Sequence, residues 1–248
     1  MRVAALYDVH GNLPALEAVL AEVRQAGIEE IVVGGDVLPG PMPRACLERL
    51  RDEAVPVHFI HGNGESGLLA EIDGSEAGRA PEAVRGIMRW VGAQLEPEHA
   101  RWLRTWPGTF RMTVPAIGEV LFCHATPRND TEIFTRLTPD ERLRPLFEGL
   151  DVDLVVCGHT HMQHDRTIAG LRVVNAGSVG MPFGKTGANW LVLGPDVQFR
   201  HTAYDLADAA RRVRQSDYPQ AEEFAGRDIL NPRAEAEMLE ALGKAELR

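Results

Sequence analysis

The stretch Val3-Ala4-Ala5-Leu6-Tyr7-Asp8-Val9-His10-Gly11-Asn12 (residues 3–12) joins a short apolar run to two side chains that can bind a metal ion. The apolar run 3–6 predicts a buried β-strand, and Asp8 and His10 follow its end. Residues two apart in an extended segment point the same way, so we expect both side chains to face one locality. A lone Asp after a strand is more often a turn or capping residue, so the pattern must recur to indicate a site.

The pattern recurs four more times along the chain. Apolar runs at 31–33, 57–60, 120–122 and 154–156 precede further Asp, Asn and His residues. The carboxyl ends of parallel strands lie along one edge of a sheet, where side chains distant in sequence meet. The sequence therefore predicts one site built from Asp8, His10, Asp36, Asn63, His124, His159 and His161.

Seven ligands of this kind suit two metal ions better than one. A catalytic zinc usually takes three protein ligands and a water, whereas two ions that share a bridging carboxylate would use the whole set. Such two-metal sites serve phosphoryl chemistry. Oxygen and nitrogen ligands without thiolate are compatible with Mn, Fe, Zn, Co or Ni, and we expect two divalent ions with Mn favoured.

The five motifs, in order, resemble those of the calcineurin-like metallophosphoesterases, and most closely the small bacterial phosphodiesterase-like members. The matching segments are D-V-H (8–10), G-G-D (34–36), G-N (62–63), C-H (123–124) and G-H-T-H (158–161), followed by N-A-G-S-V-G (175–180). The resemblance implies an α/β fold, a four-layer αββα sandwich of two mixed β-sheets. It also places the dimetal site at the carboxyl ends of the strands.

The resemblance further implies which residues hold each ion. One ion takes Asp8, His10, Asp36 and His161, and the other takes Asp36, Asn63, His124 and His159. Asp36 is then the bridge that sets the metal separation, and Asn63 and His124 fix the second ion, so these three are the expected catalytic residues. The expected reaction is attack on phosphorus by a hydroxide that bridges the metals, in line with the leaving group and without a protein nucleophile.

One position departs from the family pattern. Many members carry a His after the G-N motif that is thought to assist the leaving group, whereas this chain has Gly64 in G-N-G-E (62–65). Because such acid catalysis is typically worth about 10²–10⁴-fold, we expect a preference for phosphodiesters with good leaving groups. His61 is the alternative source of an imidazole. Phosphomonoesters, dinucleoside polyphosphates and a non-enzymatic protein-binding scaffold remain alternative functions.

Two residues are candidates for contact with substrate. Asn12 lies on the first loop, just before a predicted helix (13–26) whose dipole would favour an anion at its start. Arg128, in H-A-T-P-R (124–128), has the guanidinium geometry that suits a phosphate oxygen. The alternative for Arg128 is a surface residue in the turn after Pro127.

Composition limits the class of protein. The 248 residues suffice for one α/β domain, and no run of about 18 apolar residues is present, so we expect no membrane span. The formal charge of −10 argues against broad nucleic-acid binding. The N-terminus lacks a signal-peptide pattern, and three cysteines without a C-x-x-C motif indicate buried thiols in a reducing cytoplasm. The expected partner is a small phosphoester or nucleotide, and a homo-oligomer is possible.

The order of elements predicts the domain organisation. We expect a metallophosphoesterase domain over 1–205, in which 64–116 is a helical excursion that can roof the site. Within it, 66–80 is predicted as a loop and 81–95 and 97–105 as helices. The second sheet is assigned the strands 119–123, 154–157, 172–175, 190–193 and 197–201. A helical C-terminal tail, 206–248, is expected to pack on the domain.

Overall fold

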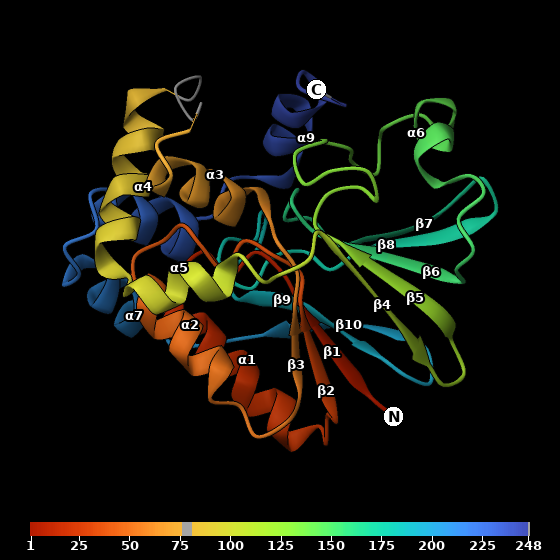
Figure 1. The fold of residues 1–248 in the computed structure, drawn as a ribbon, viewed down its shortest axis with the longest axis horizontal. Helices are drawn as coiled ribbons and strands as arrows, with labels where there is room; N and C mark the ends of the chain where they lie inside the picture. Colours follow the sequence, from red (N-terminus) through yellow and green to blue (C-terminus); the bar gives the residue numbers. More distant parts are fainter. Residues whose placement is uncertain (76–80, 248) are drawn as a thin grey trace.

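Two five-stranded β-sheets form the centre of the molecule (Figure 1). The computed structural model describes residues 1–75 and 81–247. The first sheet has the order β10-β9-β1-β2-β3 and the second the order β4-β5-β6-β8-β7. In the first, β1 (Val3–Leu6), β2 (Glu30–Val33) and β3 (Val57–Phe59) are parallel. In the second, β5 (Gly118–Cys123), β6 (Leu154–Cys157) and β8 (Leu171–Asn175) are parallel.

Strand β1 shows why its short apolar run forms a central strand. Both of its faces are covered, so every residue from Val3 to Leu6 is fully buried. Val3 and Ala5 point into the core between the two sheets, together with Phe122 and Val156. Ala4 and Leu6 point to the opposite face, into the core beneath the helices.

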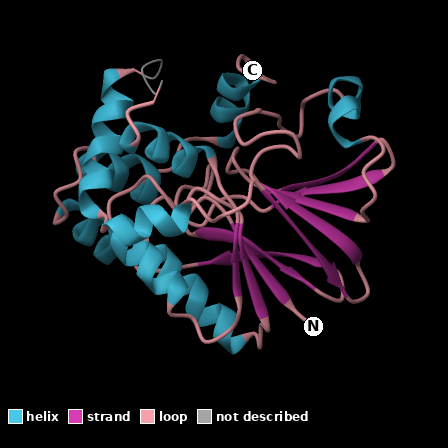
Figure 2. Cartoon of the chain, viewed as in Figure 1, coloured by secondary structure: helices cyan, strands magenta, loops and turns pink. Residues whose placement is uncertain are grey.

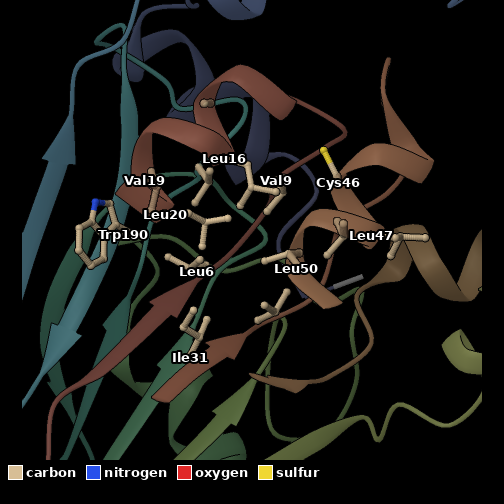
Figure 3. Packing of buried hydrophobic residues seen from close by; sticks show 14 of the residues in the cluster. Leu6, Val9, Leu16, Val19, Leu20, Ile31, Cys46, Leu47, Leu50 and Trp190 are labelled. Atoms are coloured by element: carbon tan, nitrogen blue, oxygen red, sulfur yellow. The ribbon is translucent and has the colours of Figure 1, made fainter. Parts of the chain in front are cut away.

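Helices complete the outer layers (Figure 2). The helices α1 (Leu13–Gln25) and α2 (Pro43–Arg51) cover the first sheet, where their buried stripes pack on Leu6, Ile31 and Trp190 (Figure 3). The helix α6 (Asp140–Phe147) covers the second sheet through Leu143 and Phe147. The predicted four-layer αββα fold is therefore confirmed. None of the described helices has the length and hydrophobicity that crossing a membrane requires.

Several predictions about individual strands are wrong. The segments 190–193 and 197–201 belong to β9 (Ala188–Leu193) and β10 (Val197–Thr202), and β9 pairs antiparallel with β1 in the first sheet, not the second. The second sheet gains instead the edge strands β4 (Thr109–Val114) and β7 (His164–Ile168), which have fewer buried residues. Periodicity indicates that a segment is a strand, but it contains no information about the partner that the strand selects.

The excursion after β3 is more helical than expected. It contains α3 (Asn63–Ile72), α4 (Glu82–Gln94) and α5 (Pro97–Leu103). The loop predicted over 66–80 is thus wrong for 66–72, which lie in α3, and its part 76–80 lies outside the described residues. Helix α3 begins directly at the G-N motif. Glycine and asparagine are typical of turns, so the sequence did not indicate a helix start there.

The C-terminal region packs against this helical excursion. It consists of α7 (Leu206–Arg214), the short α8 (Ala221–Glu223), a π-helix (Phe224–Leu230) and α9 (Glu235–Gly243). Ala209, Val213 and Phe224 form a small core that Ile87 and Trp90 of α4 contact. Helix α4, α7 and the π-helix therefore lie together beside the sandwich, whereas α9 lies apart from them (Figure 1).

Candidate metal centre

The loops after β1, β2, β3, β5 and β6 meet at one place, and they bring the predicted ligands together. Of the seven residues, six have a side-chain atom within 4 Å of another member: Asp8, His10, Asp36, Asn63, His124 and His161. The seventh, His159, donates its backbone N–H to Asp8 Oδ2 at 2.9 Å, and its ring lies edge-on to His124.

These loops have an unusual backbone. Asp8, His10, Asp36, His159 and His161 all have a positive φ, between 45° and 66°. They are five of the eight non-glycine residues with positive φ in the described chain. This conformation costs a side-chain-bearing residue of order 1–3 kcal/mol and is found mainly at functional sites. The extended geometry expected at Asp8 and His10 is therefore wrong, although the two side chains do face one locality. His159 and His161, also two residues apart, lie beside His124 and His10, respectively.

The first group of ligands consists of Asp8, His10 and His161. The Nε2 atoms of His10 and His161 are 3.1 Å apart, and Asp8 Oδ1 lies 3.3 Å from His161 Nε2 and 3.9 Å from His10 Nε2. Three candidate ligand atoms from the loops after β1 and β6 thus lie within 4.8 Å of one another.

The second group consists of Asp8, Asp36 and His124, and Asn63 adjoins it. His124 Nε2 lies 3.6 Å from Asp36 Oδ1 and 3.1 Å from Asn63 Oδ1. The other oxygen of Asp36, Oδ2, lies 3.7 Å from His10 Nε2 in the first group. The two oxygens of one carboxylate therefore face the two groups separately.

The proton positions on the histidines leave room for a cation. The Nδ1 atoms of His10, His124 and His161 lie 3.3, 2.9 and 2.8 Å from backbone carbonyl oxygens of Pro39, Gly34 and Met181, respectively. A carbonyl only accepts, so each Nδ1 carries a proton, and in the neutral form of each ring Nε2 keeps the lone pair that a metal ion binds.

These lone pairs then face other acceptors. The Nε2 atoms of His10 and His161 lie 3.1 Å apart, and His124 Nε2 lies 3.1 Å from the amide oxygen of Asn63. Asp8 Oδ1 and His159 Nε2 are buried with no hydrogen-bond partner among the described residues. Clustered acceptors without donors are what a bound cation satisfies, so the residues present fit divalent metal ions.

Burial also sets the charge states that metal binding needs. It lowers the pKa of His10 to about 3, with His161 adding to the effect, and lowers that of His159 to about 4, with His124 adding. Both imidazoles are therefore neutral near pH 7, the form that binds a metal. Although burial opposes both shifts, His161 holds the pKa of Asp8 below its usual range and Asp8 raises the pKa of His161, so a metal ion at this pair would take the place of a proton on His161. Burial, and then Asp8, raises the pKa of Asp36, which a shared cation would oppose.

Glu65 positions the loop that bears Asp36, and the sequence analysis missed this role. This fully buried carboxylate accepts hydrogen bonds from the backbone N–H groups of Asp36 (2.8 Å), Leu38 (2.9 Å) and Gly62 (2.9 Å). Burial, and then Asp36, raises the pKa of Glu65 to about 8, against these three bonds. A glutamate in the first turn of a helix is a capping signal that was present in the sequence.

The N-A-G-S-V-G segment ties two of the loops together. Ser178 Oγ donates to the carbonyl of Asp8 at 2.7 Å, and Gly180 N donates to the same oxygen at 2.9 Å. Asn175 Nδ2 donates to the carbonyl of Gly158, directly before His159. The segment therefore holds the ligand loops of β1 and β6 in place.

Gly64 has no space for a side chain. A Cβ at this position would lie 2.0 Å from the carbonyl oxygen of Leu38, and the Gly64 N–H donates to Asp36 Oδ1 at 2.7 Å. The position therefore cannot hold a side chain in this backbone conformation, because the loop after β2 approaches it too closely. Replacing Gly64 by His to restore the acid would clash with backbone.

His61 does not offer a free imidazole. Its Nε2 lies 2.6 Å from the carbonyl oxygen of Leu103, which holds the ring against α5. The ring also contacts Trp106 edge-on.

The two predicted substrate residues have different surroundings. Asn12 is fully buried, and its amide caps α1 through Ala15 N and donates to Gly180 O at 2.9 Å. That amide therefore positions the first loop rather than facing solvent. Arg128 is exposed and forms an ion pair with Glu132. It lines a cavity of about 350 Å³ together with His61, Thr126 and Asp130.

Comparisons with known proteins agree with this geometry. A family model described as the calcineurin-like phosphoesterase superfamily domain matches residues 1–196. An uncharacterized protein of Methanocaldococcus jannaschii is 26% identical over 239 residues, which cover 88% of this chain and 94% of that protein. Phosphodiesterase YfcE of Escherichia coli is 36% identical over 75 residues, which cover 27% of this chain and 41% of YfcE.

Solved structures share the fold. A metallophosphoesterase from Sphaerobacter thermophilus has a TM-score of 0.69 and 27% identity, covering 92% of this chain and 97% of that one. A hypothetical protein from Pyrococcus horikoshii has a TM-score of 0.78 at 21% identity, covering 94% and 99% of the two chains. The second likeness concerns the fold alone.

Proposed function

The chain belongs to the calcineurin-like phosphoesterase superfamily, and from this premise we propose that it hydrolyses phosphodiesters with the help of two divalent metal ions. The ligands are Asp8, His10, Asp36, Asn63, His124, His159 and His161, with Asp36 as the bridge. The observation that supports this most directly is the Asp36 carboxylate, whose two oxygens face His10 and His124 separately at 3.7 and 3.6 Å.

Each residue of the centre has a definite task in this proposal. Bound divalent ions would polarise the phosphoryl oxygens and lower the pKa of a water towards neutrality. Asp36 fixes the separation of the two positions, and Asn63 and His124 define the second one. Asp8 and His161 complete the first. No side chain of the centre is a nucleophile towards phosphorus.

The leaving group determines the preferred ester. No imidazole occupies the place after Asn63, and the His61 Nε2 is held by a backbone carbonyl. Without a positioned acid, poor leaving groups lose about 10²–10⁴-fold of rate, and good ones lose little. We therefore place diesters with acidic leaving groups before phosphomonoesters and dinucleoside polyphosphates.

The test is hydrolysis of bis(4-nitrophenyl) phosphate beside 4-nitrophenyl phosphate. Metal-stripped protein is assayed with and without Mn²⁺, the ion we favour for oxygen and nitrogen ligands, and then with Fe²⁺, Zn²⁺, Co²⁺ and Ni²⁺. We expect metal-dependent cleavage of the diester, lowered more than about 100-fold in Asp36→Asn, since even the outer partners of ligands are typically worth 10–100-fold.

Three results would contradict parts of this proposal. Faster cleavage of the monoester would favour a phosphomonoesterase. Asp36→Asn activity above about a tenth of the parent would remove the bridging role. Two bound metals with no cleavage of any ester or dinucleoside polyphosphate would favour a protein-binding scaffold.

A further inference from the structure

A second cavity, of about 300 Å³, opens onto His10 of the first ligand group. Half of its lining residues follow residue 196, where the family match ends: Tyr218, Gln220, Glu223, Phe224, Asp228 and Arg233. Helix α4 supplies the facing wall with Val84, Ile87 and Met88. The cavity is thus built by the helical excursion and the C-terminal region, which the metal motifs do not include.

Much of the cavity wall is apolar. Phe224 and the three α4 side chains line it, and the Tyr218 ring stands edge-on to Trp90 and Phe224, with centroids 5.3 and 6.2 Å apart. Trp90 in turn belongs to the small core that α4 shares with the C-terminal region. These contacts fix the ring of Tyr218, so the space suits a planar aromatic group.

Two polar side chains in the same wall have hydrogen-bonding atoms without a partner among the residues that the structure describes. Arg233 Nε is buried with no hydrogen-bond partner among the described residues, and its Nη1 only approaches the sulfur of Met238 at 3.8 Å. Asp228 is half-buried, and no hydrogen bond to its carboxyl occurs within residues 1–75 and 81–247. Burial raises the pKa of Asp228 to about 6, against the nearby Arg233. A ligand that offers one donor and one acceptor would pair with both side chains in this cavity.

The segment that bears Asp228 is itself unusual. It is the π-helix Phe224–Leu230. This conformation is rare in proteins, and where it occurs it is often at a functional site. Its wide turns bring Phe224 and Asp228 to the same cavity.

Resting on the proposed phosphodiesterase activity, we propose that this cavity binds the nucleobase of a nucleotide diester whose phosphorus lies at the metal centre. Asp228 accepts a hydrogen bond from a base N–H, and Arg233 donates one to an adjacent base carbonyl. The apolar walls from α4 and Phe224 hold the two faces of the ring. A polyphosphate chain fits less well, because Asp228 and Glu223 give the lining more acidic than basic side chains.

The experiment uses three 4-nitrophenyl diesters with one leaving group and different second groups: thymidine 5′-yl, phenyl and methyl. In the metal-loaded protein we expect kcat/KM to fall in that order. Val84→Trp, at an exposed lining position, should lower kcat/KM for the thymidine and phenyl esters by about 10-fold and leave kcat/KM for the methyl ester unchanged. Ala93→Trp, at an exposed place on α4 away from the cavity, is the matched control.

Asp228→Asn separates base recognition from simple apolar packing. It should raise KM for the thymidine ester about 10-fold and leave KM for the phenyl and methyl esters unchanged, because only thymine offers an N–H and a neutral amide oxygen accepts it more weakly than a carboxylate does. Glu222→Gln, an exposed neighbour paired with Arg214, is its control. Metal content per chain is measured for every variant to show that the centre is intact.

Binding of thymidine 5′-monophosphate, with inorganic phosphate as reference, gives a readout that does not depend on turnover. We expect Asp228→Asn to weaken the nucleotide about 10-fold and phosphate not at all. Equal kcat/KM for the three esters, or equal loss of all three in Asp228→Asn, would overturn the inference and leave the proposed function standing. If no ester is cleaved, the proposed function fails. The comparison of thymidine 5′-monophosphate with phosphate binding, measured by calorimetry, still decides whether the cavity recognises the base.

Discussion

The two ligand groups of the centre are similar in chemistry and different in surroundings. The first, around His10 and His161, opens to a cavity with apolar walls made by α4 and the C-terminal region. The second, around His124 and Asn63, is followed in sequence by residues of a polar cavity that includes Thr126 and Arg128. Strand ends therefore position ligands alike in both groups, and the segments inserted around them determine what can approach each.

The difference extends to how each group is held. The loop of the second group has its backbone fixed by Glu65 and by the close approach of Gly64 to Leu38. The first group depends on the segment after β8, through Met181 O at His161 and Ser178 at Asp8. Both groups are therefore held by tertiary contacts, one from the start of α3 and the other from the segment after β8.

The largest expected effect comes from removing one proposed ligand from each of the two ligand groups. His10→Ala and Asn63→Ala should each bind one metal ion fewer per chain and lower diester turnover more than about 100-fold, because both positions serve the reaction. Metal is counted by mass spectrometry after dialysis. His201→Ala, on a histidine in β10, is the control. If His10→Ala loses both ions, the groups are not separate sites.

A smaller effect should follow when the brace of the second group is crowded. Gly64→Ala places a Cβ 2.0 Å from Leu38 O and should cost about 1–3 kcal/mol of unfolding free energy. Gly67→Ala lies in the same helix, where the new Cβ meets only Met88 Cε at 3.5 Å, and should be neutral or stabilising by up to about 1 kcal/mol. Urea unfolding compares the pair, and equal midpoints would contradict the steric argument.

Glu65→Gln tests the same brace without changing its shape. Both carboxylate oxygens accept backbone N–H bonds, so a glutamine must turn its NH₂ group towards a donor. We expect a loss of about 1–3 kcal/mol in stability and a lower affinity for the second metal ion. Thermal unfolding and metal titration measure both, with the exposed Glu98→Gln as reference. An unchanged second-site affinity would show that the loop holds its position without this carboxylate.

The smallest effect is expected at Arg128. Its side chain is exposed and already paired with Glu132, so Arg128→Ala should raise KM by about 5-fold or less and leave kcat unchanged. Steady-state kinetics with the methyl 4-nitrophenyl diester measures this. A fall in kcat of more than about 10-fold would place Arg128 at the reacting phosphate instead.

Local sequence patterns were sufficient to predict the strands whose ends carry the candidate metal ligands. The runs before Asp8, Asp36, Asn63, His124 and His159 are strands, and the four-layer fold expected from the five motifs is confirmed. The assignment of β9 and β10 to the second sheet failed, because strand pairing is settled by long-range contacts such as Ala5 with Leu191. Glu65 was missed although its place in the first turn of α3 was a visible capping signal.

The sequence by itself determined the family, the layered fold and the set of residues that meet at the strand ends, because each depends on short runs and on the order of motifs along the chain. Tertiary structure alone decided three other features. They are the left-handed backbone of the ligand loops, the exclusion of a side chain at residue 64, and the cavity that the C-terminal region forms with α4. Each of these arises from contacts between segments far apart in sequence, such as Gly64 against Leu38 and Phe224 with Ile87, and no local periodicity encodes them.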